Sequence, residues 1–568
     1  MAYSGWLPLG SVYAFFACHL QLFYVRASIP AWTPQDKLIM AQKVKAMFQH
    51  AYDPYMKYAF PHDEYKPLTQ SYTDSLAELG NLDRSHLSDS YDGVALTLID
   101  SLSTLAVMRN ASEFRDRVRW LSQRLSFDKD VRVNVFECNI RVLGGLVSAH
   151  LLAQDAHSRL MPGYDGGLLR LAIDIGTRLL PAFETPTGIP FAWVNLRHGV
   201  RQGETDETNT AACGSLILEF GFLSRLSGDP RFERVAMHAL RKLWSLRSRH
   251  GLFGQTLNVS SGFWINVNGG IGAGVDSFYE YLLKAHIVFG EEEFYEMFQE
   301  AYVGVLRHMK RGPWYHETDM YTVQPTHLQF TSLQAFWPGL QVLLGDVHLA
   351  AETFKQFFRV WQRYGVLPER FLLREGTLHP TERYYPLRPE LAESTFALYK
   401  ATHDPWYLSV GQVIFESLQK HTRVEGGGHA AIRDVQTMEK EDHQHSFFLA
   451  ETCKYLYLLY DSSFLSSGNF VFTTEGHPLP VLDRDVHSLY TRTSSSNASA
   501  ARRAGTSALS SKVCPWVTSS VPASADEMTT ACHEQDSRED HRCKRAEDCG
   551  ISAQSCLARN CSAHGYCF

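Results

Sequence analysis

The chain has 568 residues, of which 45% are hydrophobic and 20% charged, and its formal net charge is −7. This balance is ordinary for a soluble globular protein, and the length suits one large domain with additional segments. The mild negative charge excludes the strongly basic surface that nucleic-acid binding requires, so no nucleic-acid partner is expected.

The N-terminus carries a targeting segment. Residues 6–25 are apolar and contain no Asp, Glu, Lys or Arg; the stretch ends with Val25, and Arg26 and Ala27 follow. Small residues at this spacing predict signal-peptide cleavage after Ala27, and a retained anchor is the alternative because the stretch is just long enough to span a bilayer. Both interpretations direct the chain into the endoplasmic reticulum (ER), with membrane attachment only if residues 1–27 stay uncleaved. No later segment is expected to cross a membrane.

From residue 36 to about residue 460 the dominant period is helical. Apolar residues recur at intervals of three and four in about a dozen stretches, for example at Phe354, Phe357, Phe358 and Trp361. Few segments show the alternation that is typical of strands. The sequence therefore predicts an all-α body.

A weak internal repeat favours paired helices. Asp229-Pro230 and Asp404-Pro405 each precede an amphipathic stretch, and Asp at the N-cap with Pro at the first helical position starts a helix well. The repeat predicts helical hairpins, which could form a solenoid, a bundle or a closed toroid.

The C-terminal part differs in composition. Residues 485–513 are low in complexity and predict a linker, because they cannot bury enough apolar surface to order themselves. Residues 514–568 form a cysteine-rich tail with seven cysteines, and the spacing from Cys556 to Cys567 is similar to the start of an epidermal-growth-factor-like module. Disulfides are expected there, and a zinc cluster is the alternative.

Carboxylates in apolar or glycine-rich surroundings are the candidate functional residues. Glu137 and Arg141 are four residues apart, so they share a helix face, and their flanks are apolar. Burial would raise the pKa of such a carboxyl, as a general acid needs. The simpler interpretation is a surface ion pair. Further candidates are Asp276 after a glycine-rich stretch, Arg388, Glu390 and Glu393 around Pro389, Phe447 and Glu451, and Thr474 and Glu475.

In this order the segments resemble the family 47 glycoside hydrolases, the class I α-mannosidases, over about residues 43–480. Residues 272–276 and 337–341 look similar to the ER degradation-enhancing α-mannosidase-like branch. The resemblance implies an all-α (α/α)7 barrel over residues 36–482. It also implies an enzyme of the ER lumen that cleaves α-1,2-linked mannose, with inversion, from mannose-rich N-glycans of misfolded glycoproteins, and so promotes ER-associated degradation.

The resemblance also implies roles for individual residues. Glu137 matches the general acid, Glu390 the base that activates water, and Asp276 a third essential carboxylate. Thr474 matches the ligand of the family's Ca²⁺, through its hydroxyl and carbonyl oxygens. The positions that match substrate-binding residues are Arg141, Arg388, Glu393, Phe447, Glu451 and Glu475.

Several positions depart from the family pattern. The family usually has an acidic residue before Ser446, and this chain has His445, which cannot replace the paired acceptors of a carboxylate near neutral pH. Gly476 stands where alanine is usual, and Ser103 where aspartate is usual. These departures favour an alternative function, a protein of the same pathway that binds mannose-rich glycans without cleaving them.

Two cysteines of the branch are also absent. One is replaced by Gln70, and the other is lost within residues 426–429. If the two normally pair with each other, losing both is more coherent than losing one. An ER oxidoreductase is a partner that such cysteines would serve, and their absence argues against that partnership here.

Overall fold

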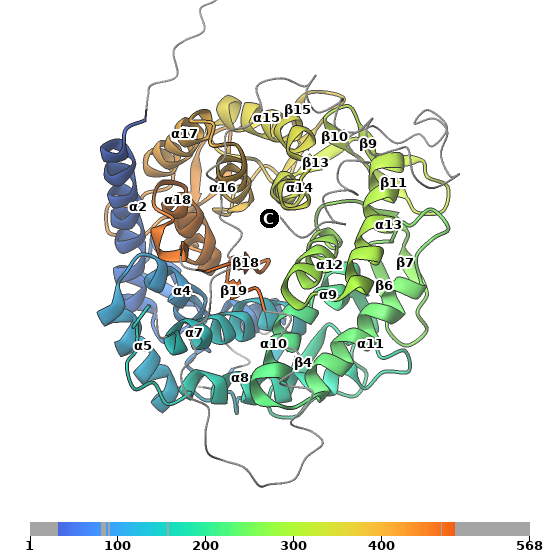
Figure 1. Cartoon of the computed structure of the whole chain (residues 1–568), viewed down its shortest axis with the longest axis horizontal. Coiled ribbons are helices and arrows are strands. Elements are labelled where there is room, and N and C mark those ends of the chain that lie inside the picture. Colours follow the sequence, from blue (N-terminus) through green and yellow to red (C-terminus); the bar gives the residue numbers. More distant parts are fainter. Residues whose placement is uncertain (1–31, 81–86, 89–90, 156–157, 467, 483–568) are drawn as a thin grey trace, which may run out of the picture. The chain divides into compact units, whose positions relative to one another are not determined.

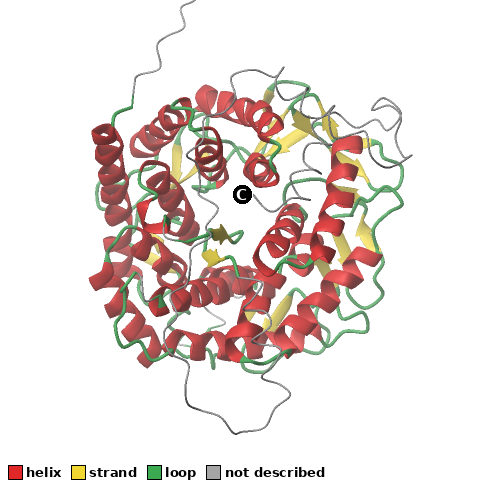
Figure 2. Ribbon diagram, in the orientation of Figure 1, coloured by secondary structure: helices red, strands yellow, loops and turns green. Residues whose placement is uncertain are grey.

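The computed structural model describes residues 32–80, 87–88, 91–155, 158–466 and 468–482. The expected signal segment or anchor (1–27), the linker (485–513) and the cysteine-rich tail (514–568) lie outside the described residues. The described part consists mainly of helices, joined by loops with short antiparallel strands (Figure 1, Figure 2).

Helices of the described residues form an inner and an outer ring (Figure 1). The inner helices are α4 (Leu96–Val107), α7 (Gly144–Gln154), α10 (Ile217–Ser227), α12 (Asp276–Phe289), α14 (Trp337–Leu344), α16 (Glu390–Thr402) and α18 (Cys453–Tyr460). The outer helices are α2 (Pro34–Pro54), α5 (Ala111–Arg124), α8 (Gly167–Leu179), α11 (Arg231–Ser245), α13 (Glu292–His308), α15 (Val347–Tyr364) and α17 (Trp406–His421).

Each inner helix packs against an outer one. Six of these pairs are consecutive hairpins, from α4 with α5 to α16 with α17, and the seventh joins α18 to α2 from the other end of the described chain. This last pairing closes the ring. The predicted (α/α)7 barrel is therefore confirmed, and the toroid is the correct choice among the three arrangements that the repeat allowed.

The helices of the inner and outer rings differ in how much of their surface is buried. Every residue of α4 is buried, because an inner helix contacts protein on all sides. The outer helix α15 buries one face through Phe354, Phe357, Phe358 and Trp361, the residues whose spacing predicted it. The predicted helix starts are correct to within one residue: α11 and α17 begin just after Pro230 and Pro405, and Asp229 and Asp404 accept the amides of Arg231 and Trp406.

Short helical segments connect the rings. The short α-helices are α3 (Ser75–Leu79), α6 (Val135–Glu137) and α9 (Thr210–Gly214), and the 3₁₀ segments are η4 (Leu180–Phe183), η5 (Ser332–Phe336) and η7 (Ser463–Leu465). Three further segments are π-helical, namely η1 (Tyr55–Ala59), η3 (Cys138–Leu143) and η6 (Phe448–Thr452). Such π-turns occur frequently at functional sites, and η3 and η6 contain predicted site residues.

The strands form small antiparallel sheets. The two-stranded sheets are β1 (Glu64–Lys66) with β2 (Ser71–Thr73), β3 (Arg132–Asn134) with β4 (Trp193–Asn195), β9 (Lys310–Arg311) with β10 (Trp314–Tyr315), β16 (Ala431–Asp434) with β17 (Glu439–Glu441), and β18 (Phe470–Phe472) with β19 (Pro478–Pro480). The three-stranded sheets are β5 (Glu207–Asn209), β6 (Thr256–Asn258) and β7 (Trp264–Asn266); β8 (Asn268–Gly269), β11 (Glu317–Asp319) and β12 (Pro325–His327); and β13 (Gln329–Thr331), β14 (Arg370–Leu372) and β15 (Thr377–Leu378).

One stretch corrects the expectation about membrane segments. Val135–Gln154 is long and apolar enough to cross a membrane by length and composition. It forms α6, η3 and α7 of the barrel, and 78% of its most apolar window is buried inside the protein. Packing in the barrel core explains its hydrophobicity.

Candidate active site

The turn between β18 and β19 carries Thr474 and Glu475 and lies inside the ring of helices (Figure 1). Phe472 pairs with Pro478 in the hairpin. Gly476 has a φ of +66°, and a β-carbon there would lie 2.9 Å from Cγ of Glu451. Because glycine alone adopts this conformation without strain, it lets the turn approach Glu451 closely.

Arg141 joins two carboxylates from distant segments. Its Nε donates to Glu137 Oε2 (2.8 Å), and its Nη1 donates to Glu475 Oε1 (2.7 Å) and to Ser446 Oγ (3.1 Å). Asn134 caps α6 by accepting the Glu137 amide (3.0 Å). The Glu137 side chain is 27% exposed and that of Arg141 16% exposed. The pair is therefore partly buried, and it is not the exposed surface ion pair that the spacing alone allows. Glu137, Arg141, Glu475 and Ser446 are called the Arg141 network below.

Fully buried polar groups support this network. Ser446 Oγ donates to Asp100 Oδ2 (2.5 Å), and His477 Nε2 lies 3.2 Å from Asp100 Oδ1. The Lys454 ammonium donates to the Gly476 carbonyl (2.6 Å). Asp100 belongs to α4 and Lys454 to α18, so these contacts hold the β18–β19 turn against two inner helices.

A second guanidinium, Arg388, is bound by a carboxylate that the sequence analysis did not single out. Arg388 donates from Nε and Nη2 to the two oxygens of Glu369 (2.7 and 2.9 Å), and Ser332 Oγ donates to Glu369 as well (2.8 Å). Such a bidentate pair fixes the plane of the guanidinium. Leu387 has a φ of +68°, which is rare for a residue with a branched side chain. The contacts with Glu369 fix the position of the Arg388 side chain, and Arg388 precedes Glu390 by two residues.

Asp276 and Glu390 are the first residues of α12 and α16, and burial raises the pKa of each to about 7. The charge of Glu137 raises the pKa of Asp276 further, and the charge of Asp276 does the same for Glu390, whereas Arg388 lowers both pKa values. Charges act in this way only over short distances. Asp276 thus interacts electrostatically with both Glu137 and Glu390, although the three predicted catalytic acids come from three segments of the chain.

Glu393 lies one helical turn after Glu390, in similar surroundings. Burial raises its pKa to about 8, the ammonium of Lys284 opposes that rise, and the charges of Glu280 and Glu390 add to it. Glu280 and Lys284 form a buried ion pair along α12. Asp276, Arg388, Glu390 and Glu393 are called the Arg388 side below.

Glu451 and Glu475 are buried carboxylates that repel each other. They are 4% and 3% exposed. Burial raises the pKa of both well above the usual range, and the charge of Glu475 adds to the effect on Glu451. Arg141 opposes the rise for Glu475. Burial also lowers the pKa of the nearby Lys454 to about 8. Burial and mutual repulsion thus disfavour the ionised form of both carboxyls, and a bound cation would stabilise that form.

The Phe447 ring contacts both Arg141 of the Arg141 network and the imidazole of His445. The Arg141 guanidinium lies 5.2 Å from the centre of its ring. His445 stacks on Phe447 with 4.9 Å between ring centroids and 9° between planes. Burial lowers the pKa of His445 to about 3, so the imidazole is neutral at physiological pH.

Thr474 lies in oxygen-rich surroundings. Its amide donates to the Tyr281 hydroxyl (3.5 Å), which in turn donates to Glu219 Oε1 (2.5 Å). Among the residues that the structure describes, none forms a hydrogen bond with the Thr474 hydroxyl, so this oxygen is available to a cation. Ca²⁺ takes roughly six to eight oxygen ligands, from hydroxyls, carbonyls, carboxylates and waters. The surroundings of Thr474 therefore fit the predicted ion.

These contacts or charge interactions link the predicted site residues other than Thr474, which precedes Glu475 in the chain. The predicted site residues are Glu137, Asp276, Glu390, Arg141, Arg388, Glu393, Phe447, Glu451, Glu475 and Thr474. The assignment missed Glu369, Glu280 and Lys454. The sequence could have indicated Lys454, because its charge interrupts the apolar run of α18. No sequence pattern indicated Glu369.

Gln70, which replaces one of the absent cysteines, lies beside the segment 426–429 within which the other is lost. A β-carbon on Gly426 would lie 2.9 Å from Nε2 of Gln70. In the described part of the chain the cysteines are Cys138, Cys213 and Cys453, and all three are buried and unpaired. The described residues therefore expose no thiol to a redox partner.

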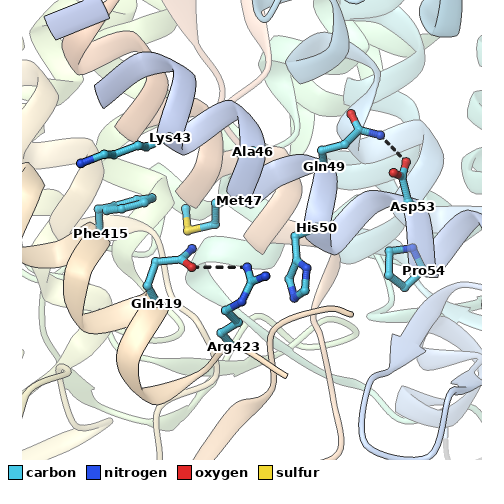
Figure 3. Close-up of a pocket in the computed structure, with 10 residues that line it drawn as sticks. All are labelled: Lys43, Ala46, Met47, Gln49, His50, Asp53, Pro54, Phe415, Gln419 and Arg423. Carbon is cyan, nitrogen blue, oxygen red and sulfur yellow. Dashed lines mark hydrogen bonds between the residues drawn. The ribbon is translucent and has the colours of Figure 1, made fainter. Parts of the chain in front are cut away.

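A separate groove of about 660 Å³ lies between α2 and α17 (Figure 3). Its one carboxylate, Asp53, is hydrogen-bonded to Gln49, and Gln419 accepts from Arg423 (3.4 Å). This groove lacks the paired acids that glycoside hydrolysis needs, and none of the predicted site residues lines it. Its lining residues are Lys43, Ala46, Met47, Gln49, His50, Asp53, Pro54, Phe415, Gln419 and Arg423.

Comparison with known proteins gives one consistent result. The family described as glycosyl hydrolase family 47 matches residues 47–481. The chain is 56% identical to alpha-mannosidase I MNS5 of Arabidopsis thaliana over 93% of each chain. It is 42% identical to human ER degradation-enhancing alpha-mannosidase-like protein 2, over 83% of this chain and 82% of that protein. The structure of the alpha-1,2-mannosidase from Trichoderma reesei superposes with a TM-score of 0.71 at 26% identity, covering 78% of this chain and 99% of that one.

Proposed function

The chain belongs to glycosyl hydrolase family 47, and from this premise we propose that it is an inverting, Ca²⁺-dependent α-1,2-mannosidase of the ER lumen. Its substrates would be the mannose-rich N-glycans of misfolded glycoproteins, which it trims to promote their degradation. One observation carries the proposal: Glu137, Asp276 and Glu390 come from three segments, yet Asp276 interacts electrostatically with both of the others.

Glu137 is the proposed general acid, which protonates the oxygen of the leaving sugar. Arg141 binds its Oε2 at 2.8 Å, and this contact orients the carboxyl while Oε1 remains for proton transfer. The 27% exposure of the side chain leaves it within reach of a substrate. A protonated carboxyl at the leaving oxygen is the requirement of the first half of the reaction.

Glu390 is the proposed general base, which takes a proton from the attacking water. Its pKa of about 7 suits this role, because a base works best when its pKa is near the working pH. Asp276 supports the same step from α12, as a second acceptor for that water. In an inverting enzyme the acid and the base stand about 6.5–9.5 Å apart, which leaves room for the water between base and sugar.

Thr474 would hold Ca²⁺ through its hydroxyl and carbonyl oxygens, with waters completing the shell. When bound, the ion supplies positive charge that orients sugar hydroxyls beside the acids. Glu451 and Glu475 stand next to this position, and their burial and mutual repulsion support a cation there. Phe447 offers an apolar face for the ring of the mannose.

The cellular setting rests on the relatives and the N-terminus. Several relatives are named as ER degradation-enhancing proteins, and residues 1–27 are expected to direct the chain to the same compartment. An anchor remains the alternative to cleavage. The cysteines of the described part are buried, so an ER oxidoreductase could pair only through cysteines outside it.

The direct test is digestion of a nine-mannose N-glycan by the purified protein, with and without a Ca²⁺ chelator, followed by glycan profiling. The proposal expects release of mannose that stops on chelation, resumes with Ca²⁺, and is absent in Glu137→Gln. Glu375→Gln, a change at an exposed residue of a loop, is the matched control and should keep full activity. No release by the parent under any condition would reject the enzymatic proposal.

One observation favours a second function. His445 is neutral and packs on Phe447 where the family usually has a carboxylate, so a substrate contact made by that carboxylate would be missing. The second function is binding of mannose-rich glycans without cleavage. Glycan binding that survives Glu137→Gln, combined with no turnover by the parent, would favour it.

A further inference from the structure

Three metal-ligand side chains, Glu64, His443 and His445, lie together beside Phe447. Glu64 Oε2 is 2.6 Å from His443 Nε2 and 3.9 Å from His445 Nδ1. One ligand atom from each side chain lies within 4.8 Å of the other two. None of the three residues has a role in the mannosidase mechanism proposed above.

One strand bridge produces the cluster. His443 and His445 are two residues apart in an extended segment, so both imidazoles project from the same face. Gln444 between them pairs antiparallel with Tyr65, and its amide donates to the Tyr65 carbonyl (2.9 Å). Glu64, the neighbour of Tyr65 on β1, therefore faces the same side as the two histidines.

The donor set selects one class of ion. Two imidazoles and a carboxylate are ligands of zinc sites that keep a fourth position for water. With bonds of about 2.0–2.1 Å in a tetrahedron, ligand atoms stand about 3.3 Å apart. The separations of Glu64 Oε2 from the two histidine nitrogens, 2.6 and 3.9 Å, bracket that value. Nitrogen donors disfavour Ca²⁺, which prefers oxygen, so this site differs from that of Thr474.

Neighbouring groups support the ligands. The Ser446 amide donates to Glu64 Oε1 (2.7 Å), which orients the carboxylate and leaves Oε2 toward the histidines. The Glu64 side chain is 4% exposed, whereas those of His443 and His445 are 25% and 24% exposed. The carboxylate is thus anchored inside the protein, and the imidazoles are open to an ion from solvent.

We propose that Glu64, His443 and His445 bind one Zn²⁺ or similar transition-metal ion, with water as the fourth ligand. The ion fastens β1 to the segment that carries Phe447, and so supports the aromatic face next to Arg141. The proposal does not depend on mannosidase activity.

The competing explanation is an ion pair. A protonated His443 bound to Glu64 accounts for their short contact, and His445 then serves only as an aromatic neighbour of Phe447. A metal ion and a proton compete for the same ring nitrogen, so direct metal binding separates the two explanations.

The experiment uses the full chain without a polyhistidine tag, stripped of metal and kept in excess Ca²⁺. Co²⁺ is titrated as a coloured substitute for Zn²⁺. The proposal expects one Co²⁺ with visible d–d bands of a nitrogen and oxygen site, which vanish when Zn²⁺ displaces it. Thiolate ligands would add intense charge-transfer bands, so binding by the cysteine-rich tail is distinguishable.

Two variants preserve the packing while removing ligands. His445→Phe keeps an aromatic ring on Phe447, and His443→Gln keeps a donor to Glu64. Each should weaken Zn²⁺ binding by about 100-fold or more, because outer-shell changes alone cost about 10–100-fold. His327→Ala is the matched control, since His327 pairs with Glu317 on the surface (3.0 Å). Unchanged affinity in both variants, or no d–d spectrum in the parent, would overturn the proposal and leave the ion pair as the explanation.

Discussion

The Arg141 network and the Arg388 side treat their carboxylates differently. In the Arg141 network the guanidinium binds Glu137 directly at 2.8 Å. On the Arg388 side the guanidinium is bound by Glu369 (2.7 and 2.9 Å), and Glu390 keeps a pKa of about 7 because burial is only partly offset. The Arg141 network positions Glu137 through a direct contact with a guanidinium. The Arg388 side leaves Glu390 able to gain or lose a proton near neutral pH. A site with a positioned acid and a titrating base needs both arrangements.

Neutralising the base should give the largest effect on activity. Glu390→Gln removes the proposed proton acceptor, and we expect kcat/KM to fall by about 10²–10⁴-fold. The folded pKa of about 7 lies above the ordinary value of 4.5, so the folded state binds more protons between these pH values and stability declines as pH rises through them. The variant lacks this decline. Denaturation in chelator should therefore show it more stable than the parent at pH 8, by about 3 kcal/mol, and nearly equal at pH 4.5.

Glu375→Gln again controls for the change of chemistry, because Glu375 is exposed. It should leave both activity and stability unchanged. A Glu390→Gln variant that is less stable than the parent at pH 8 would contradict the view that desolvation dominates on the Arg388 side.

Removing the cation of the Arg141 network should have the opposite effect on stability. Arg141→Met removes the guanidinium that pairs with the buried Glu475 (2.7 Å) and lies 3.9 Å from Asp100. Breaking a buried pair in this way costs about 3–5 kcal/mol of unfolding free energy. Urea denaturation at pH 7 measures it, with Arg359→Met on the exposed face of α15 as control. Recovery of part of the loss in Arg141→Met/Glu475→Gln would show that the unpaired carboxylate is the cause, and full additivity of the two changes would contradict this.

The same two regions show what the sequence could reveal. Part of the Arg141 network could be predicted from the sequence. Glu137 and Arg141 are one helical turn apart, and this local spacing predicts their contact. The partner of Arg388 could not be predicted from the sequence. Glu369 lies 19 positions away on another segment, and no periodic pattern links the two residues. The resemblance to a family named the site residues, but it carried no information on which guanidinium binds which acid.

The fold shows a similar limit. Phe354, Phe357, Phe358 and Trp361 predicted α15 because one helix face is a local property. Closure of the barrel rests on α2 packing against α18, which are about 400 residues apart and whose patterns do not specify each other. The π-helices η3 and η6 were likewise unpredicted, because a single wide turn does not change the apolar period enough to be seen.

The Ca²⁺ position should respond to one hydroxyl. Thr474→Val keeps the carbonyl and the shape of the side chain but removes the hydroxyl oxygen, and we expect Ca²⁺ affinity to fall by about 10–100-fold. Activity as a function of free Ca²⁺ measures this, and excess Ca²⁺ should restore it. Thr322→Val in an exposed loop is the control. Unchanged Ca²⁺ dependence in Thr474→Val would place the ion elsewhere and separate it from both regions.

The smallest effect is a shift in the pH profile. Glu390 must be ionised to accept a proton, so kcat/KM should fall about tenfold per pH unit below its pKa of about 7. Arg388 lowers this pKa, and Arg388→Gln removes that charge, so the midpoint should move up by about one unit. Arg388→Lys keeps the charge and should leave the midpoint in place even if kcat/KM falls, because lysine cannot form the bidentate contact with Glu369. An equal midpoint in all three proteins would mean that the titrating base is not held on the Arg388 side, and that the two regions do not divide the work as their contacts indicate.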